Sequence, residues 1–261
     1  MASAFVTGMN QFTVGTFTTK IFLPPGWNAA DPNSHFHAHF LGNGENNVSM
    51  VENLAPGSLV KNGGPWDGLI YKADGNVARI AILLIHSGSG GLTAHTAVIN
   101  YCIEQLGIPT TGDLAWLRFQ ASGISGGPGR FYNFAMNSTS PYKGLFRKRF
   151  MLSPVNIVDP YPGILNEDNR GFTYVFYADR DQVVPAIYAQ NLYIKTKGKK
   201  KIKQVISQSH NSSVWNPEFA ITGLNTPNGS TANTNAWRYL TDPYDGIGTY
   251  NLNATLAYDQ S

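Results

Sequence analysis

The sequence predicts an α/β fold in which a mostly parallel central sheet is covered by helices on both faces. Two observations lead to this prediction. Segments that are almost wholly apolar alternate along the chain with segments of helical spacing, as they do in repeated β–α units. The run "ARIAILLI", residues 78–85, is continuously apolar, which is typical of a strand buried on both faces of a parallel sheet. Sites in such sheets form at the carboxyl ends of the strands.

The first half of the chain gives four elements. "FTVGTFTTKIFLPP" alternates and then meets two prolines, which indicates an early strand and its end. "HFHAHF" predicts a short strand that runs into the Gly/Asn loop "LGNGENN". After the long apolar strand, apolar residues recur at helical spacing, Cys102 among them, and this pattern ends at a glycine with a proline just beyond. The expected strands are 12–25, 35–40 and 78–85, and the expected helix is 93–106.

The second half continues the alternation. The segments "LAWLRFQAS", "KRFMLS", "GFTYVFYA" and "IKQVISQS" have strand character, whereas "RFYNFAM" and "PAIYAQNLYIKT" have helical character. The expected strands are therefore 114–122, 148–153, 171–178 and 202–209, and the expected helices are 130–136 and 185–196. We assign residues 1–240 to one α/β domain and residues 241–261 to a carboxy-terminal extension of unknown role.

The amino-acid composition limits the kinds of binding partner that can be expected. Charged residues make up 13% of the chain, about half of the roughly 25% typical of soluble domains. The net charge of +3 is too small to imply a nucleic-acid partner. Much of the positive charge lies in "KTKGKKKIK", residues 195–203, which we interpret as a solvated loop between a helix and a strand. We expect no nucleic-acid partner.

Cysteine usage and the apolar runs bear on the compartment. The single cysteine, Cys102, permits no intrachain disulfide and is expected to be a buried helical thiol. The amino terminus has no basic start followed by an apolar stretch, so no signal peptide is evident, and the longest apolar run is too short to span a membrane. A surface rich in Gly, Asn, Ser and Thr favours a soluble extracellular or virion-associated protein without a membrane partner.

A glycine-rich stretch after a predicted strand contains the first candidate catalytic residue. Ser125 lies in Gly123-Ile124-Ser125-Gly126-Gly127, which matches the pattern G-x-S-x-G. A sharp turn between strand and helix presents the serine oxygen, and glycines are needed because side chains would collide with both elements. The N–H of Gly126 would lie at a helix N-terminus, where it can stabilise an oxyanion. The alternative is a flexible surface turn.

Two further candidates follow later strands. Asp181 comes just after the strand 171–178, and His210 just after the strand 202–209. The order Ser, Asp, His is that of the catalytic triad found in α/β hydrolases, and all three residues would meet at one sheet edge. Alternatively, Asp181 is a helix N-cap, for which Asp179 competes, and His210 is a loop histidine.

Taken together, these motifs resemble the α/β-hydrolase esterases, in particular the poly(3-hydroxybutyrate) depolymerase-like carboxylesterases and predicted peptidases. The similar segments are "IFLPPGWN", "FLGNGE", "GISGG", "DRDQVVP" and "SHNSSVWNPEF", between residues 12 and 240. The resemblance implies an α/β-hydrolase fold with Ser125 as nucleophile, His210 as general base and Asp181 orienting the imidazole. It also implies that the oxyanion donors are the N–H groups of Gly126 and of Gly42 or Asn43.

The sequence departs from the family at two places. Leu41 replaces the usual histidine before the first glycine of the oxyanion loop, and the helix after the serine begins Gly127-Pro128-Gly129. These departures leave open a catalytically silent α/β-hydrolase domain that serves as a structural or glycan-binding module.

The expected activity is that of a serine carboxylesterase that needs no cofactor. Its substrate would be an ester-bearing small molecule or polysaccharide with acetyl- or feruloyl-type acyl groups. Trp215, beside the predicted base, is a candidate substrate-binding residue, and His86 is a second one by family analogy. A further alternative is a metal-dependent hydrolase, because His35, His37 and His39 would share one face of a strand.

Overall fold

The fold was described from a computed structural model of the chain. The structure describes residues 4–43, 69–71, 76–87, 90–162, 172–205 and 210. Within these ranges, no helix has both the length and the hydropathy that a membrane crossing requires.

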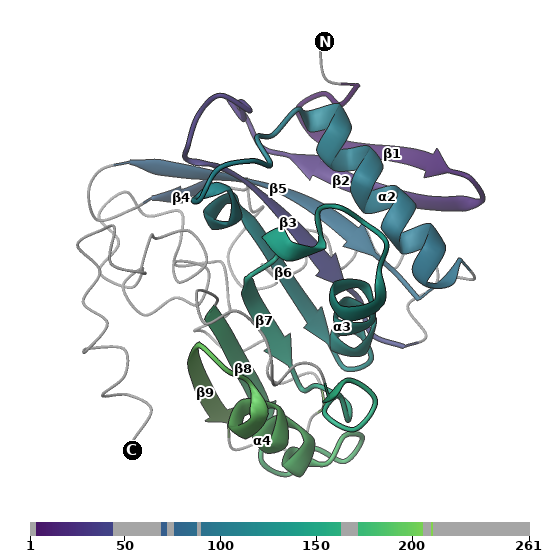
Figure 1. The fold of residues 1–261 in the computed structure, drawn as a ribbon, viewed down its shortest axis with the longest axis vertical. Helices are drawn as coiled ribbons and strands as arrows, with labels where there is room; N and C mark the ends of the chain where they lie inside the picture. Colours follow the sequence, from purple (N-terminus) through teal and green to yellow (C-terminus); the bar gives the residue numbers. More distant parts are fainter. Residues whose placement is uncertain are drawn as a thin grey trace.

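A single mixed sheet forms the centre of the molecule. Its order is β1-β2-β5-β3-β6-β7-β8-β9, with β4 also paired to β5 (Figure 1). The neighbouring strands β5, β3, β6, β7, β8 and β9 are parallel to one another, whereas β1, β2 and β4 pair in antiparallel fashion. The bounds are β1 Gly8–Val14, β2 Phe17–Leu23, β3 Ser34–Phe40, β4 Leu69–Tyr71, β5 Val77–Ile85, β6 Phe119–Ile124, β7 Lys148–Leu152, β8 Phe172–Ala178 and β9 Lys199–Val205. The predicted, mostly parallel sheet is therefore confirmed.

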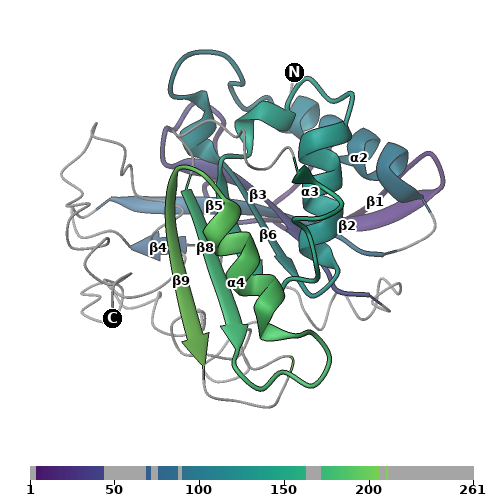
Figure 2. The same ribbon diagram turned by 60° about the horizontal axis from the view of Figure 1, so that its bottom comes forward.

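Three helices within the described ranges pack against one face of this sheet. They are α2 (Gly91–Leu106), α3 (Gly127–Asn137) and α4 (Ala186–Lys195). Figure 2 shows α2 near β1 and β2, α3 near the middle strands, and α4 beside β8 and β9. Because each described helix contributes to the same apolar core, the predicted helices on the second face stay a prediction.

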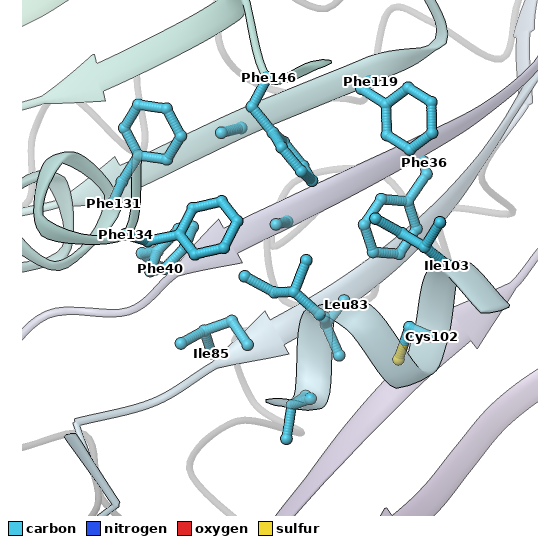
Figure 3. Packing of buried hydrophobic residues seen from close by; sticks show 14 of the residues in the cluster. Phe36, Phe40, Leu83, Ile85, Cys102, Ile103, Phe119, Phe131, Phe134 and Phe146 are labelled. Atoms are coloured by element: carbon cyan, nitrogen blue, oxygen red, sulfur yellow. The ribbon is translucent and has the colours of Figure 1, made fainter. Parts of the chain in front are cut away.

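The core on the helix-covered face is rich in aromatic side chains. Phe36, Phe119 and Phe146 make edge-to-face contacts with ring centroids 5.7 to 6.1 Å apart, an arrangement that adds to the stabilisation from burial. Figure 3 shows these rings in the same cluster as Cys102, which α2 contributes. Cys102 is buried and free, as the helical spacing predicted, and burial raises the pKa of its thiol.

The amino-terminal strand was predicted as one element and is two. Residues 12–25 were expected to form a single strand, but β1 and β2 form a hairpin in which Val14 pairs with Phe17. Gly15 has a φ of 61°, a left-handed conformation that glycine adopts without steric cost. The alternating pattern continues through a two-residue turn, so it did not reveal the reversal. The three-residue strand β4 is too short to leave a pattern.

Two other boundaries were wrong. The expected strand 114–122 begins with a 3-10 turn, Ala115–Arg118, before β6, because an apolar run alone does not separate a strand from a short buried helix. The basic run 195–203, expected to be a loop, contains the start of β9. Among the described strands β9 pairs with β8 alone, and lysines are common on such edge strands, where they oppose further pairing.

Candidate functional site

The carboxyl ends of the parallel strands bring the predicted site residues to one edge of the sheet. The loop 41–43 follows β3, Ser125 follows β6, and Asp181 follows β8 by three residues. These strands run in the same direction, so their ends face the same side of the molecule (Figure 1). This is the edge at which sheets of this class form their sites.

Ser125 occupies a strained turn between β6 and α3. Its φ is 57°, a left-handed value that non-glycine residues adopt rarely. The backbone is fixed on both sides, since the Ser125 N–H donates to the Leu152 carbonyl at 2.9 Å and the Val155 N–H donates to the Ser125 carbonyl at 3.2 Å. The side chain is only partly covered. This conformation is the one expected of a serine presented at the end of a strand.

The glycines around Ser125 are needed for the reason that the sequence indicated. A Cβ at Gly123 would lie 2.6 Å from the backbone nitrogen of Pro128, and a Cβ at Gly126 would lie 2.6 Å from the Asn43 Cγ. Both distances are shorter than real Cβ contacts allow. Pro128 lies in the first turn of α3, where its missing N–H leaves no helical bond unmade.

The predicted oxyanion residues lie together at the start of α3. Gly126 is the N-cap of this helix, and the Asn43 side chain lies directly beside it. A Cβ at Gly127 would collide with the Phe40 carbonyl group, so the chain from Phe40 to Asn43 passes close against the helix start. Within the described ranges, the N–H groups of Gly126 and Asn43 make no hydrogen bond. Leu41, which replaces the family's histidine, is buried in the core.

Asp181 is held by the turn in which it lies. Its Oδ1 accepts hydrogen bonds from the backbone N–H groups of Val183 and Val184, at 2.8 and 2.9 Å. Its Oδ2 lies 2.6 Å from Nδ1 of His210. The competing residue, Asp179, instead makes a 3.6 Å ion pair with the largely exposed Arg180. Of the two acidic residues in this turn, Asp181 is therefore the partner of His210.

The two ring nitrogens of His210 differ in their hydrogen bonding within the described part of the chain. The Nδ1–H donates to Asp181, which fixes the tautomer that leaves a lone pair on Nε2. This Nε2 is buried and makes no hydrogen bond within the described part of the chain. The Ser153 hydroxyl donates to the His210 carbonyl at 3.3 Å, and Ser153 directly follows Leu152, whose carbonyl binds Ser125. His210 is thereby attached beside the Ser125 turn.

The three histidines of β3 form a buried polar network. His37 contacts Gln120 through Nδ1 at 3.2 Å and Ser122 through Nε2 at 2.6 Å, and His39 Nδ1 also lies 2.6 Å from the Ser122 hydroxyl. His35 lies in the strand and contacts Gln120 at 3.1 Å. Burial lowers the pKa of His37 to about 3 and that of His39 to about 4. Among the described residues, no group of three His, Cys, Asp or Glu could hold a metal ion.

His86, one of the two predicted substrate-binding residues, is held against β2. Its Nε2 lies 2.8 Å from the Thr18 carbonyl, and the ring stacks on Phe17 with centroids 4.4 Å apart. Neither contact involves Ser125 or His210, so the substrate role of His86 stays a prediction. The other predicted residue, Trp215, lies outside the described residues, as does the predicted extension 241–261.

Two residues of this edge were missed by the sequence analysis. Ser153, which binds the His210 carbonyl, has a φ of 40°, and nothing in the letters "MLSPV" distinguishes it from an ordinary loop serine. Arg130 binds both ends of the segment Leu41–Asn43, although it lies 87 residues after Asn43 in the chain. The one signal available for Arg130 was its position in the helical stretch that follows the Ser-Gly-Gly turn.

Comparison with known proteins supports the fold. No protein-family model and no curated protein matches the chain. Among solved structures, the chain is similar to a truncated carbohydrate esterase from gut microbiota, with a TM-score of 0.56, 11% identity, and 90% of this chain and 97% of the other covered. It is also similar to Est1E from Butyrivibrio proteoclasticus, with a TM-score of 0.51, 10% identity, and 90% and 99% covered.

A third similar structure is the esterase Est2 from Thermogutta terrifontis, with a TM-score of 0.53, 13% identity, and 87% and 89% of the two chains covered. At these identities the likeness concerns the fold. Together with the parallel sheet and the turn at Ser125, it shows that the chain has the α/β-hydrolase fold, as the sequence predicted.

Proposed function

We propose that this chain is a serine esterase in which Ser125 is the nucleophile, His210 the general base and Asp181 the residue that orients the imidazole. The observation that carries the proposal is the Asp181–His210 hydrogen bond of 2.6 Å, which leaves a buried imidazole nitrogen without a partner among the described residues, beside the strained Ser125 turn. A histidine held in this tautomer can accept a proton from a serine hydroxyl.

The reaction follows from these roles in two halves. As the Ser125 oxygen attacks the ester carbonyl carbon, its proton passes to Nε2 of His210, and a tetrahedral oxyanion forms. Collapse of this intermediate breaks the ester C–O bond, and the imidazolium donates its proton to the departing alcohol. The acyl group stays on Ser125. Water then attacks the acyl carbonyl and gives a proton to Nε2, which forms a second tetrahedral oxyanion. Collapse of this intermediate breaks the bond to the Ser125 oxygen, which takes the proton back from the imidazolium, so that the carboxylic acid, the free serine and the neutral His210 are released.

The oxyanion is stabilised by backbone N–H groups at the start of α3. The N–H of Gly126 lies at a helix N-terminus, where donors point outward and the helix dipole favours negative charge. The second donor comes from Gly42 or Asn43, in the segment that lies against Gly126. Removing one such donor typically costs about 10²–10³ in kcat.

The proposed substrates are acyl esters of a polysaccharide or glycan, with acetyl- or feruloyl-type acyl groups. One of the similar structures is a carbohydrate esterase. The low content of charged residues, 13% of the chain, suits a protein that works outside the cell or on a virion. The mechanism needs no cofactor. A second candidate is a silent module, because the Asn43 side chain lies directly beside Gly126, the residue that carries one of the proposed oxyanion donors.

The test is covalent labelling by a fluorophosphonate probe together with hydrolysis of 4-nitrophenyl acetate. We expect the wild-type protein to be labelled and to turn over the ester, and Ser125→Ala to lose both, because the probe reacts much faster with an activated serine than with other hydroxyl groups. Wild-type protein that has been heat-unfolded serves as the control for non-specific labelling. Absence of labelling in well-folded wild-type protein would contradict the esterase proposal and favour the silent module.

A further inference from the structure

We propose that Arg130 is a positioning residue: its guanidinium holds the oxyanion loop, defined as Leu41–Asn43, against the start of α3. The proposal rests on the proposed esterase function, because it assigns a task in that reaction. Two contacts carry it. Nη1 of Arg130 donates to Oδ1 of Asn43 at 2.9 Å, and Nη2 donates to the Leu41 carbonyl. One side chain thus binds both ends of the three-residue loop.

Other contacts restrain this loop at each end. The Leu41 N–H donates to the Ile85 carbonyl at 2.8 Å, which ties the first residue of the loop to the end of β5. Asn43 has a single hydrogen bond within the described residues, the one from Arg130. Asn43 also packs on Gly126. Within the described ranges, the guanidinium is therefore the polar anchor of the Asn43 side chain.

Arg130 is attached to the same helix start that it serves. Its backbone N–H donates to the Gly126 carbonyl at 3.3 Å, the first turn of α3. The side chain therefore links the residue carrying one proposed oxyanion donor to the loop carrying the other. If the loop moves relative to α3, the two donors no longer point at one oxygen atom, and catalytic groups of this kind must be held within about 0.5 Å of the productive geometry.

The contact requires the chemistry of arginine. A guanidinium presents several N–H groups in a fixed plane and can bind two acceptors in different directions, whereas a lysine ammonium is a single point on a flexible stem. The imidazole of His95 adds no positive charge beside the guanidinium. Burial is the larger cause, and the positive charge of Arg130 a further one, of a His95 pKa lowered to about 4. Since His95 is neutral at neutral pH, its ring presents no second cation to the guanidinium.

The experiment compares Arg130→Ala and Arg130→Lys with wild-type protein, using Arg147→Ala as the control for loss of an arginine outside the site. Hydrolysis of 4-nitrophenyl acetate gives kcat and KM, and hydrogen exchange reports on the peptide that contains the loop. We expect kcat of the alanine variant to fall about 10- to 10³-fold, in the range for loss of one oxyanion donor, with KM changed less than about threefold. Loop exchange should rise, and millimolar guanidinium chloride should restore part of kcat.

The outcomes separate the positioning role from the esterase function. Equal kcat for Arg130→Ala and Arg147→Ala, or a rise in KM at unchanged kcat, would overturn the positioning role. Full activity of Arg130→Lys would overturn the argument for a planar fork. If the wild-type protein itself has no Ser125-dependent turnover, the esterase function fails, and hydrogen exchange still decides on the contact: exchange unchanged by Arg130→Ala would overturn it, and faster exchange would support it.

Discussion

Changing Asp181 to asparagine tests the role of the Asp181–His210 pair with almost no change in shape. The Oδ1 atom, which accepts from the N–H groups of Val183 and Val184, is retained. The Oδ2 atom, 2.6 Å from Nδ1 of His210, becomes an amide NH₂, which is a donor. A donor in this place favours the tautomer with its proton on Nε2. The nitrogen that must accept the Ser125 proton then has no lone pair to offer.

The size of the effect follows from how closely the pair is held. The two side chains are 15% and 2% exposed, so water compensates little for the lost contact. In a chymotrypsin-type protease the corresponding change lowers kcat about 10⁴-fold, equal to about 5.4 kcal/mol at about 1.36 kcal/mol for each factor of ten. We expect a loss of about 10³–10⁴ in kcat for Asp181→Asn, with the free energy of unfolding changed by about 1 kcal/mol or less, since both backbone donors stay satisfied.

The assay is steady-state hydrolysis of an aryl ester with thermal unfolding of the same samples, and Asp179→Asn is the matched control. Asp179 lies two residues away in the same turn but pairs with the exposed Arg180 at 3.6 Å, so its loss should leave kcat within about twofold. Asp181→Asn activity within about tenfold of the wild type at unchanged stability would refute the reasoning. A loss of similar size in both variants would do so as well, because it would point to the turn rather than to the carboxylate.

The remaining predictions concern Gly126 and the buried histidines. Gly126→Ala should lower kcat at least about tenfold, because its Cβ would displace Asn43, whereas Gly129→Ala in the same helix meets a side-chain atom at 3.6 Å and should be tolerated; equal activities would contradict this. The pKa values of His37 and His39 are lowered in the folded state, so the unfolded chain binds more protons than the folded chain below about pH 6.5. The free energy of unfolding should therefore decrease as the pH is lowered from about 6.5 to about 4. The decrease should reach up to about 1.4 kcal/mol per pH unit for each imidazole. Thermal unfolding against pH checks it, and the slope should decrease in His37→Gln; an unchanged slope would contradict the assignment.

The sequence sufficed for the sheet because burial on both faces leaves a strong mark. β5 and β8 are almost continuously apolar, and each lies where its run of letters predicted. The errors came where two structures share one pattern. Alternation continues through the hairpin at Gly15, and an apolar run covers both the turn Ala115–Arg118 and the strand after it. β9 was misjudged because lysines indicate solvent, and an edge strand meets solvent too.

The site was predictable where a residue's neighbours in sequence determine its role. Ser125 was found through the glycines beside it, and Asp181 through the strand before it and the helix after it. Arg130 and Ser153 act on segments far away in sequence, on the loop after β3 and on the His210 carbonyl. Such contacts depend on the register of the folded sheet. The spacing of residues along a single sequence does not reveal which distant segments the folded sheet brings into contact.

The backbone gives a reason to regard this edge as a site rather than as a set of turns. Among the described residues, seven glycines have positive φ, and two non-glycine residues do, Ser125 and Ser153. Each such conformation costs on the order of 1–3 kcal/mol in a residue with a side chain, and glycine would adopt it without that cost. Serine at both places therefore indicates that the hydroxyls are needed. The Ser153 hydroxyl binds the His210 carbonyl, and attack on an ester carbonyl is the use that the proposal gives to the Ser125 hydroxyl. A Ser125→Gly variant that was more stable than the wild type yet inactive would show that the hydroxyl is kept for activity at a cost in stability.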